Sequence, residues 1–320
     1  MTAAGAERLP ITVAGCLLIA LGLALAAPVS IALARAGWTR RAPGWSLLLW
    51  QAVCLAAGFS VVAGLALLAV EPAGYTLVGA GLHWWSSLMA GELTAWQAAC
   101  GMLSLAITIV LLASLTRTAW RTVSRRRLHR QMVDLLSRPI PARVPLGVGC
   151  QMRLMDHRSA VAYTLPGLHA RLVVSTGLVD LLTPAELTAV VEHERAHLRA
   201  RHDILIMPFQ SWVAAFGRVR GVREAGRSVG ELTEMLADDV AAARSAADVL
   251  ASALARVALE GRCGAVGASA WSVATPTTCI TDRVRRLRHP DPLSSVARTV
   301  IVLVAVALLA VPPTVLTLTW

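Results

Sequence analysis

Four long apolar runs constrain this chain more than any other feature of its sequence. They extend over residues 11–34, 45–70, 96–115 and 299–316. A helix of about twenty residues is long enough to cross the hydrocarbon of a bilayer. The mean hydropathy of +0.62 is also too high for a soluble domain of this length. The sequence therefore predicts an integral membrane protein with four helical spans.

The first run has a competing interpretation as a secretory signal peptide. Glu7 and Arg8 both precede it, the run is longer than the apolar core of a usual signal peptide, and further apolar runs follow. These features favour a span.

Positive charge indicates the orientation of the spans. All 30 basic residues are arginine, the net charge is +11, and most of these arginines flank the apolar runs. Three lie between the first two runs and six lie within residues 117–130, whereas residues 71–93 have none. Arginines gather on the cytoplasmic side of membrane proteins, so residues 117–298 are expected in the cytoplasm and both termini outside. The same distribution argues against a direct nucleic-acid partner.

The pattern predicts a mostly α-helical protein of three parts. Residues 1–116 hold three spans, residues 117–298 form a cytoplasmic α+β domain, and residues 299–320 hold the fourth span. Residues 71–93 are expected to form an interfacial loop on the far side of the membrane. Within the domain, Val161–Leu165 and Leu172–Val174 predict short strands, because both are apolar segments bounded by turn residues.

One predicted helix carries the strongest functional motif. Thr183–Glu186 has the form of a helix start, with a threonine cap, proline at the first position and a glutamate that completes a capping box. On this helix, which is expected to end near Arg201, His193 and His197 project from one face. Two imidazoles placed in this way can bind one zinc ion, and Glu194 can act as general base without binding the metal. The composition predicts only roughly 0.006 chance matches to this His-Glu-x-x-His motif.

A catalytic zinc site needs a third protein ligand. Ser228–Glu231 has the form of a second capping box and is expected to open a helix that continues to about Glu260. Glu234 and Asp238 share a face of that helix. Glu234 can therefore coordinate zinc, and Asp238 can accept a hydrogen bond from a ligating histidine.

Other polar residues near the motif have a structural interpretation. Glu231 fits a helix cap and Asp239 a solvated position, and His202 is expected at a surface on another side of the helix. The apolar stretch 204–216 is too short to span a membrane, so it is expected in the core or at the membrane surface. Three residues are candidates for the oxyanion donor, a role that the sequence leaves unfilled: Arg283, Arg285 and Tyr163.

Together these features resemble the BlaR/MecR group of bacterial membrane zinc metallopeptidases. The resemblance rests on the arrangement of spans and on the motifs His193-Glu194-x-x-His197 and Glu234-x-x-Ala237-Asp238, and it covers nearly the whole chain. The lead-in segments Ala162–Gly167 and Leu172–Leu178 are also similar to those of the group.

The resemblance implies a gluzincin-type fold with one zinc ion per chain. His193, His197 and Glu234 would be the ligands, Glu194 the base, and Asp238 a carboxylate that orients a ligand. Leu172, Val173 and Val174 resemble the edge strand on which such peptidases bind an extended substrate.

The resemblance also implies a biological role. Members of the group lie in the bacterial cell membrane and answer an extracellular signal by cleaving or inactivating a cytoplasmic BlaI-like winged-helix repressor; a homodimer is left open. The antibiotic sensors of the group carry a penicillin-binding domain after the last span. This chain stops at Trp320, so direct acylation by a β-lactam is not expected.

Two other functions stay open. One is a membrane quality-control peptidase like the HtpX and Ste24 groups, which share both motifs. The other is a non-proteolytic receptor or scaffold for a repressor, against which Glu194 argues, because a structural zinc site needs no base. The three spans before the domain and one after it favour the signalling peptidase.

Overall fold

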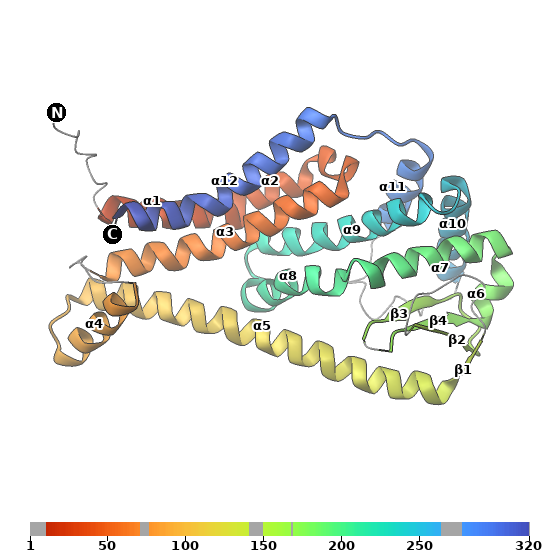
Figure 1. Ribbon diagram of the computed structural model, residues 1–320, viewed down its shortest axis with the longest axis horizontal. Coiled ribbons are helices and arrows are strands. Elements are labelled where there is room, and N and C mark those ends of the chain that lie inside the picture. Colours follow the sequence, from red (N-terminus) through yellow and green to blue (C-terminus); the bar gives the residue numbers. More distant parts are fainter. Residues whose placement is uncertain (1–10, 71–76, 141–149, 168, 264–276, 320) are drawn as a thin grey trace.

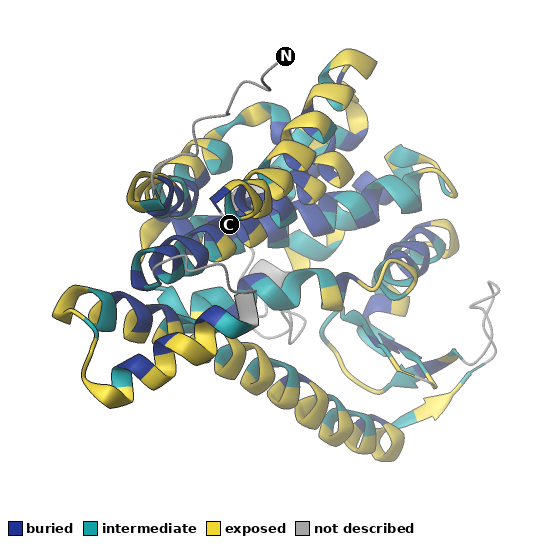
Figure 2. Cartoon of the chain, turned by 60° about the vertical axis from the view of Figure 1, so that its left-hand side comes forward, coloured by how far each residue is buried: buried dark blue, intermediate teal, exposed yellow. Residues whose placement is uncertain are grey.

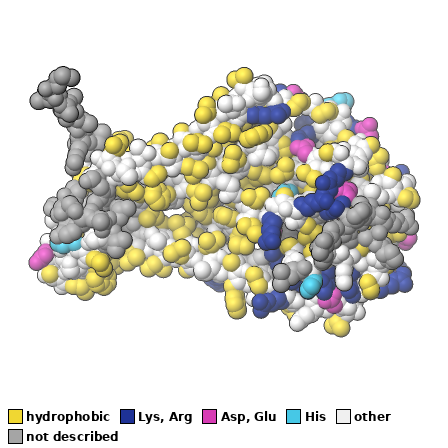
Figure 3. Space-filling model, in the orientation of Figure 1, with side chains coloured by type: hydrophobic (Ala, Val, Ile, Leu, Met, Phe, Trp, Pro, Cys, Tyr) yellow, Lys and Arg dark blue, Asp and Glu magenta, His cyan; other side chains and the backbone are white. Residues whose placement is uncertain are grey.

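The computed structural model describes residues 11–70, 77–140, 150–167, 169–263 and 277–319, and it is mostly helical (Figure 1). Among these residues, four helical segments are long and apolar enough to cross a membrane: Ile11–Arg35, Pro43–Ala69, Ala95–Leu136 and Ser295–Thr319. They coincide with the four apolar runs of the sequence. Hydrophobic side chains predominate on the half of the visible surface that these segments form, and most of the visible arginines lie on the other half (Figure 3).

The first span is not a uniform α-helix. It consists of α1 (Ile11–Ala24), a π-helical turn η1 (Leu25–Val29) and α2 (Ser30–Arg35). Pro28 lies within η1 and lacks the N–H that a regular helix needs there, which accounts for the local change of winding. A short 3₁₀ segment η2 (Gly37–Arg41) then leads into α3 (Pro43–Ala69).

Two expectations for the membrane part need correction. Residues 77–90 form a helix, α4 (Leu77–Ala90), and not a loop, while residues 71–76 lie outside the described residues. The helix that contains the third apolar run does not end near 116, because α5 (Ala95–Leu136) continues through the expected domain boundary as one helix. Most of α5 is exposed along its length (Figure 2). The spans and the domain are therefore joined by a continuous helix.

The described part of the domain contains one four-stranded sheet in the order β1-β2-β4-β3. Its strands are β1 (Ser137–Pro139), β2 (Gln151–Met155), β3 (Ala162–Leu165) and β4 (Arg171–Ser175). β2 and β4 are parallel, and the other two pairs are antiparallel. The two strands that the sequence predicted are confirmed as β3 and β4.

The expectation that Leu172, Val173 and Val174 form an edge is wrong. These three residues belong to β4, which pairs with β2 on one side and β3 on the other, and all three are fully buried. A run that is apolar at every position is typical of a strand with both faces covered. Among the described residues, the edge strands of the sheet are β1 and β3.

Helices cover both faces of the sheet. Leu172 and Val174 face Val191 of α7 (Pro184–Arg199) and Ala253 of α10 (Ala247–Cys263), whereas Val173 faces Val133 of α5. α6 (Thr176–Leu181) connects β4 to α7, and α11 (Thr277–Arg288) and α12 (Ser295–Thr319) end the chain.

A helical hairpin connects the domain to the spans. Its arms are α8 (His202–Phe216) and α9 (Arg220–Ala242), and both pack against α3. The helix expected over residues 228–260 is therefore two helices, and Ser228 lies inside α9 and does not cap it. Val222 and Ala225 are buried against neighbouring helices. This packing stabilises the first turns of α9, which come before Ser228.

Small residues let the first two spans approach closely. A side chain on Gly64 would stand 2.6 Å from the backbone oxygen of Gly15, and one on Gly22 would stand 2.8 Å from the backbone oxygen of Ala57. Since neighbouring helices and lipid are equally apolar, such close packing is a main source of helix association in membranes.

We predict that Gly64→Val forces these two spans apart and lowers the free energy of unfolding by about 1–3 kcal/mol. Thermal unfolding of the detergent-solubilised chain would measure the loss. Gly81→Val is the matched control, because nothing lies within 4 Å of the position of its Cβ on α4. Equal losses in both variants would mean that helix propensity, and not close packing, explains the effect.

Candidate metal centre

The helix α7 begins and ends as its sequence requires. The Thr183 side chain accepts from the Glu186 N–H, and the Glu186 carboxylate accepts from the Thr183 N–H, which confirms the capping box. The helix has a buried face that includes Ala189 and Val191, which holds it against the sheet and α10. This packing fixes the direction in which the two histidines of α7 point.

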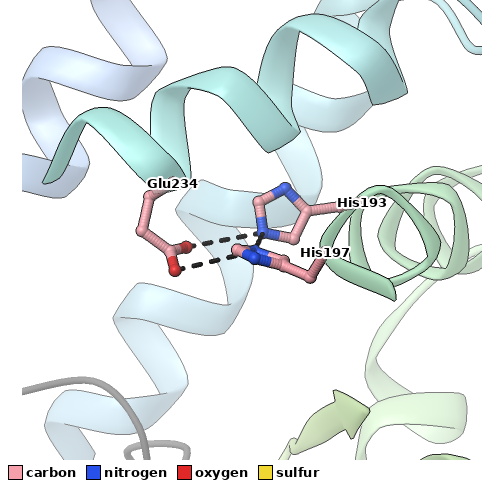
Figure 4. Close-up of side chains that lie close together, drawn as sticks. All are labelled: His193, His197 and Glu234. Carbon is pink, nitrogen blue, oxygen red and sulfur yellow. Dashed lines mark hydrogen bonds and ion pairs between the residues drawn. The ribbon is translucent and has the colours of Figure 1, made fainter. Parts of the chain in front are cut away.

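Three side chains from α7 and α9 converge at one point (Figure 4). The Nε2 atoms of His193 and His197 are 3.2 Å apart. The carboxylate oxygens of Glu234 lie 3.5 Å from His193 Nε2 and 3.6 Å from His197 Nε2. Within the described residues, this is the group that could hold a metal ion.

The donor set fits zinc. Zinc takes nitrogen and carboxylate ligands at about 2.0–2.2 Å, so tetrahedral ligand atoms stand about 3.4 Å from one another. The three separations between His193, His197 and Glu234 lie near that value. Three protein ligands leave one coordination position unused, as in catalytic zinc sites.

The second nitrogen of His193 is held by a buried carboxylate. Its Nδ1 lies 3.0 Å from Oδ1 of Asp238, which is fully buried on α9 one turn beyond Glu234. This contact assigns the proton to Nδ1 and leaves the lone pair of Nε2 for the metal. Burial opposes protonation of His193, but the two carboxylates outweigh it and raise the pKa of the metal-free ring to about 10. A zinc ion would take the place of the second proton.

Arg283 of α11 forms ion pairs with both acidic groups. It donates two hydrogen bonds of 2.7 Å to Asp238, and its Nη1 lies 3.2 Å from Oε2 of Glu234. Burial raises the pKa of Asp238, but the charge and hydrogen bonds of Arg283 lower it further, to about 2. The pKa of Glu234 is likewise held below its ordinary value, against burial, by His193 and Arg283. Both carboxylates are therefore charged, as ligation and ligand orientation require.

His202 contacts His197, the second candidate ligand, contrary to the expectation of a surface position. Its Nδ1 lies 2.9 Å from Nδ1 of His197, and the residue is buried. Arg201, with φ of 48°, turns the chain between α7 and α8 and places His202 over His197. Burial lowers the pKa of His197 to about 3 and that of His202 to about 4, so both rings are neutral near pH 7. His197 can then donate from Nδ1 to His202 and offer Nε2 to the metal.

Glu194 lies beside the three ligands and does not belong to them. Burial raises the pKa of its carboxyl to about 7, although the charge of His193 and a hydrogen bond from Thr164 lower it. A group with a pKa near 7 can accept and return a proton under physiological conditions. Because Thr164 belongs to β3, the free edge strand is linked directly to the candidate base.

The other residues singled out from the sequence have different surroundings. Tyr163 contacts Nε2 of His129 at 3.1 Å, and Arg285 is exposed and pairs with Asp282. Glu231 pairs with Arg40 and Asp239 with Arg286, so neither is the cap or the solvated acid that was expected. Of the three oxyanion candidates, Arg283 contacts a candidate ligand, Glu234, and it does so as an ion-pair partner. The printed contacts of Tyr163 and Arg285 are to other residues. The role of oxyanion donor therefore stays unfilled.

We predict that His202→Leu weakens zinc binding about 10–100-fold, because His197 loses the acceptor that orients it. His202→Asn should bind zinc nearly as the wild type does, since its amide oxygen can take the place of Nδ1. Competition with a fluorescent zinc chelator measures both variants, with the exposed His289→Ala as control. Equal affinity of the Leu variant and the wild type would contradict this role.

We also predict that Arg283→Met destabilises the chain by about 3–5 kcal/mol, because two buried carboxylates lose their cation. Arg285→Met removes the same charge from an exposed position and should change the free energy of unfolding by less than about 0.5 kcal/mol. Thermal unfolding of the two variants in detergent makes the comparison. Similar stability of both would show that Arg283 is dispensable for the fold.

Comparison with known proteins agrees with this geometry. Residues 122–290 match peptidase family M48, and the matched region contains His193, Glu194, His197, Glu234 and Arg283. No curated protein and no solved structure matches the chain. The match supports the coarser part of the resemblance seen in the sequence, a membrane zinc metallopeptidase, whereas membership of the BlaR/MecR group stays a prediction. The family match and the converging ligands lead to one assignment: the chain belongs to peptidase family M48.

Proposed function

We propose that this protein is a membrane-anchored, zinc-dependent endopeptidase that cleaves proteins close to the membrane surface. The observation that carries the proposal is Glu194, a candidate base with a raised pKa beside a three-ligand group that leaves one position for a reactant. A structural zinc site would have four protein ligands and no need of a base.

The residues of the chain divide the chemistry among them. Zinc, when bound by His193, His197 and Glu234, supplies a Lewis acid that polarises a carbonyl group and acidifies water. Glu194 takes a proton from the attacking water and delivers it to the leaving amine. Asp238, His202 and Arg283 hold the ligands in place and set their charge.

The strand β3 is the candidate position for substrate. One side of Ala162–Leu165 pairs with β4, and within the described residues no strand pairs with the other side. An extended peptide can add to such an edge through backbone hydrogen bonds, which gives affinity with little sequence discrimination. Since Thr164 of this strand bonds to Glu194, a peptide along β3 would pass close to the base.

Two classes of substrate fit this site. The arginine distribution favours a domain in the cytoplasm, where a BlaI-like repressor would be the regulated substrate and signal transduction the role. The packing of α8 and α9 on α3 favours membrane proteins, as in quality control, because the ligand Glu234 lies on a helix that touches the spans.

The deciding experiment compares protein N-termini in host cells that carry the wild type, Glu194→Gln or Glu260→Gln. Glu194→Gln should keep zinc but lower cleavage by at least about 100-fold, because it cannot accept a proton. Glu260 is exposed and far along α10, so Glu260→Gln should cleave as the wild type does.

The pattern of new N-termini separates the candidates. One cleaved cytoplasmic regulator supports the signalling role, and many cleaved membrane proteins support quality control. Identical N-termini in all three strains, with equal zinc content, would exclude a peptidase and leave the receptor or scaffold.

A further inference from the structure

The second half of α5 runs beside the sheet and outside the hydrocarbon of the membrane (Figure 1). Arg130 is 15 residues beyond the end of the third apolar run, which corresponds to about 22 Å along a helix. Three residues further on, Val133 packs against Leu165 of β3 and Val173 of β4. This part of α5 therefore forms a wall next to β3, the strand on which we place the substrate.

The register of β3 indicates which of its backbone groups a substrate can reach. The Ser175 N–H donates to the carbonyl of Val161, so the backbone groups of Ala162 and Thr164, the next residues in alternation, point away from β4. A peptide that adds to β3 would therefore pair with Ala162 and Thr164. Because Thr164 also bonds to Glu194, the peptide bond to be cleaved would lie beside Thr164.

Arg130 lies at the end of this strand. Its Nη2 donates to the carbonyl of Pro166, which follows β3 and is two residues from Thr164, or about 7 Å in an extended chain. Leu165 faces α5, and a peptide residue opposite Leu165 would direct its side chain to the same face of the sheet. A substrate side chain one or two residues from the cleaved bond would thus approach Arg130.

Arg130 has no acidic partner of its own inside the protein. The residue is partly buried, and its Nε is buried with no hydrogen-bond acceptor. Within the ranges that the structure describes, no carboxylate lies within ion-pairing distance of this guanidinium. A cation that loses solvent is costly unless an anion replaces the lost solvation. The position therefore favours a carboxylate from outside the chain.

The charges near Arg130 strengthen this preference. Three neighbouring arginines repel it: Arg126, Arg127 and Arg171. Asp134 attracts it, but this acid already pairs with Arg171 at 2.6 Å. Arg127 is exposed and, as far as the structure describes the chain, also has no acidic partner. The end of β3 next to α5 therefore has an excess of positive charge that would attract an acidic peptide.

We propose that Arg130 is a specificity-determining residue that binds the carboxylate of an aspartate or glutamate in the substrate, one or two residues from the cleaved bond on the side of Pro166. The inference rests on the proposed function, because it assumes a peptide bound along β3. A guanidinium binds a carboxylate through charge-assisted hydrogen bonds, which neutral side chains cannot match. The substrate class that fits the site is thus an extended segment with an acidic residue close to the cut.

The test digests a chymotryptic peptide library of a bacterial proteome with the zinc-loaded full chain in detergent, and mass spectrometry identifies the residues around each cut. Aspartate and glutamate should be enriched within two residues of the cut on one side only. A quenched fluorescent peptide made from a preferred site then compares Glu, Gln and Lys at that position. The Glu peptide should exceed the Gln peptide about 10-fold in kcat/KM, as one charge-assisted hydrogen bond implies.

Two matched variants locate the effect. Arg130→Gln should abolish the ratio between the Glu and Gln peptides, mainly by raising KM for the Glu peptide, and should leave kcat for the Gln peptide unchanged. Arg125→Gln removes the same charge from an exposed position on another side of α5, so it should keep the ratio of the wild type.

Each outcome decides the inference. An acidic preference that Arg130→Gln alone loses supports it. Cleavage without acidic enrichment, a ratio that survives in Arg130→Gln, or an equal loss in Arg125→Gln would overturn it and leave the peptidase intact. If the wild type cleaves no peptide at all, the proposed function fails and the inference fails with it. If Arg130→Gln does not purify, the pattern of cuts made by the wild type still decides.

Discussion

The buried ion pair between Arg283 and Asp238 is the interaction on which the metal centre depends. The helix α9 brings two carboxylates, Glu234 and Asp238, into the interior beside the histidines of α7. Removing charges from water costs several kcal/mol per ion unless partners of opposite charge replace the lost solvation. Arg283, 45 residues after Asp238, meets both carboxylates at once. The path of the chain back to α11 is thus a requirement of the site and not only of the fold.

The parts that could be predicted from the sequence depend on local spacing. The four spans follow from the length of the apolar runs, and the two histidines share a face because they are four residues apart on a helix whose cap is also local. Glu234 and Asp238 are likewise one turn apart. Their approach to the histidines needed a chemical argument, namely that zinc requires a third ligand, because no local pattern gives it.

The parts that were missed depend on chain reversal or on distant partners. His202 was placed on the wrong side because a continuous helix was projected through Arg201, where the backbone turns to positive φ. The role of Arg283 depends on a contact with Asp238, which is 45 residues away in the sequence. β4 was expected at the edge of the sheet because its parallel pairing with β2 leaves no local signal in the sequence. The start of α9 was missed because burial against the spans extends it beyond its apparent cap.

The membrane part and the metal centre cannot be treated as separate modules. α5 crosses the expected boundary without interruption. α8 begins with His202, α9 carries Glu234 in its second half, and the two helices meet at a turn beside the spans. From Gly221 to Glu234, α9 is one helix about 20 Å long. A packed helix of that length transmits a shift as a rigid body, because its side chains interdigitate with their neighbours at crystal-like density. A displacement at the membrane end of α9 would therefore move Glu234, one of the three candidate zinc ligands.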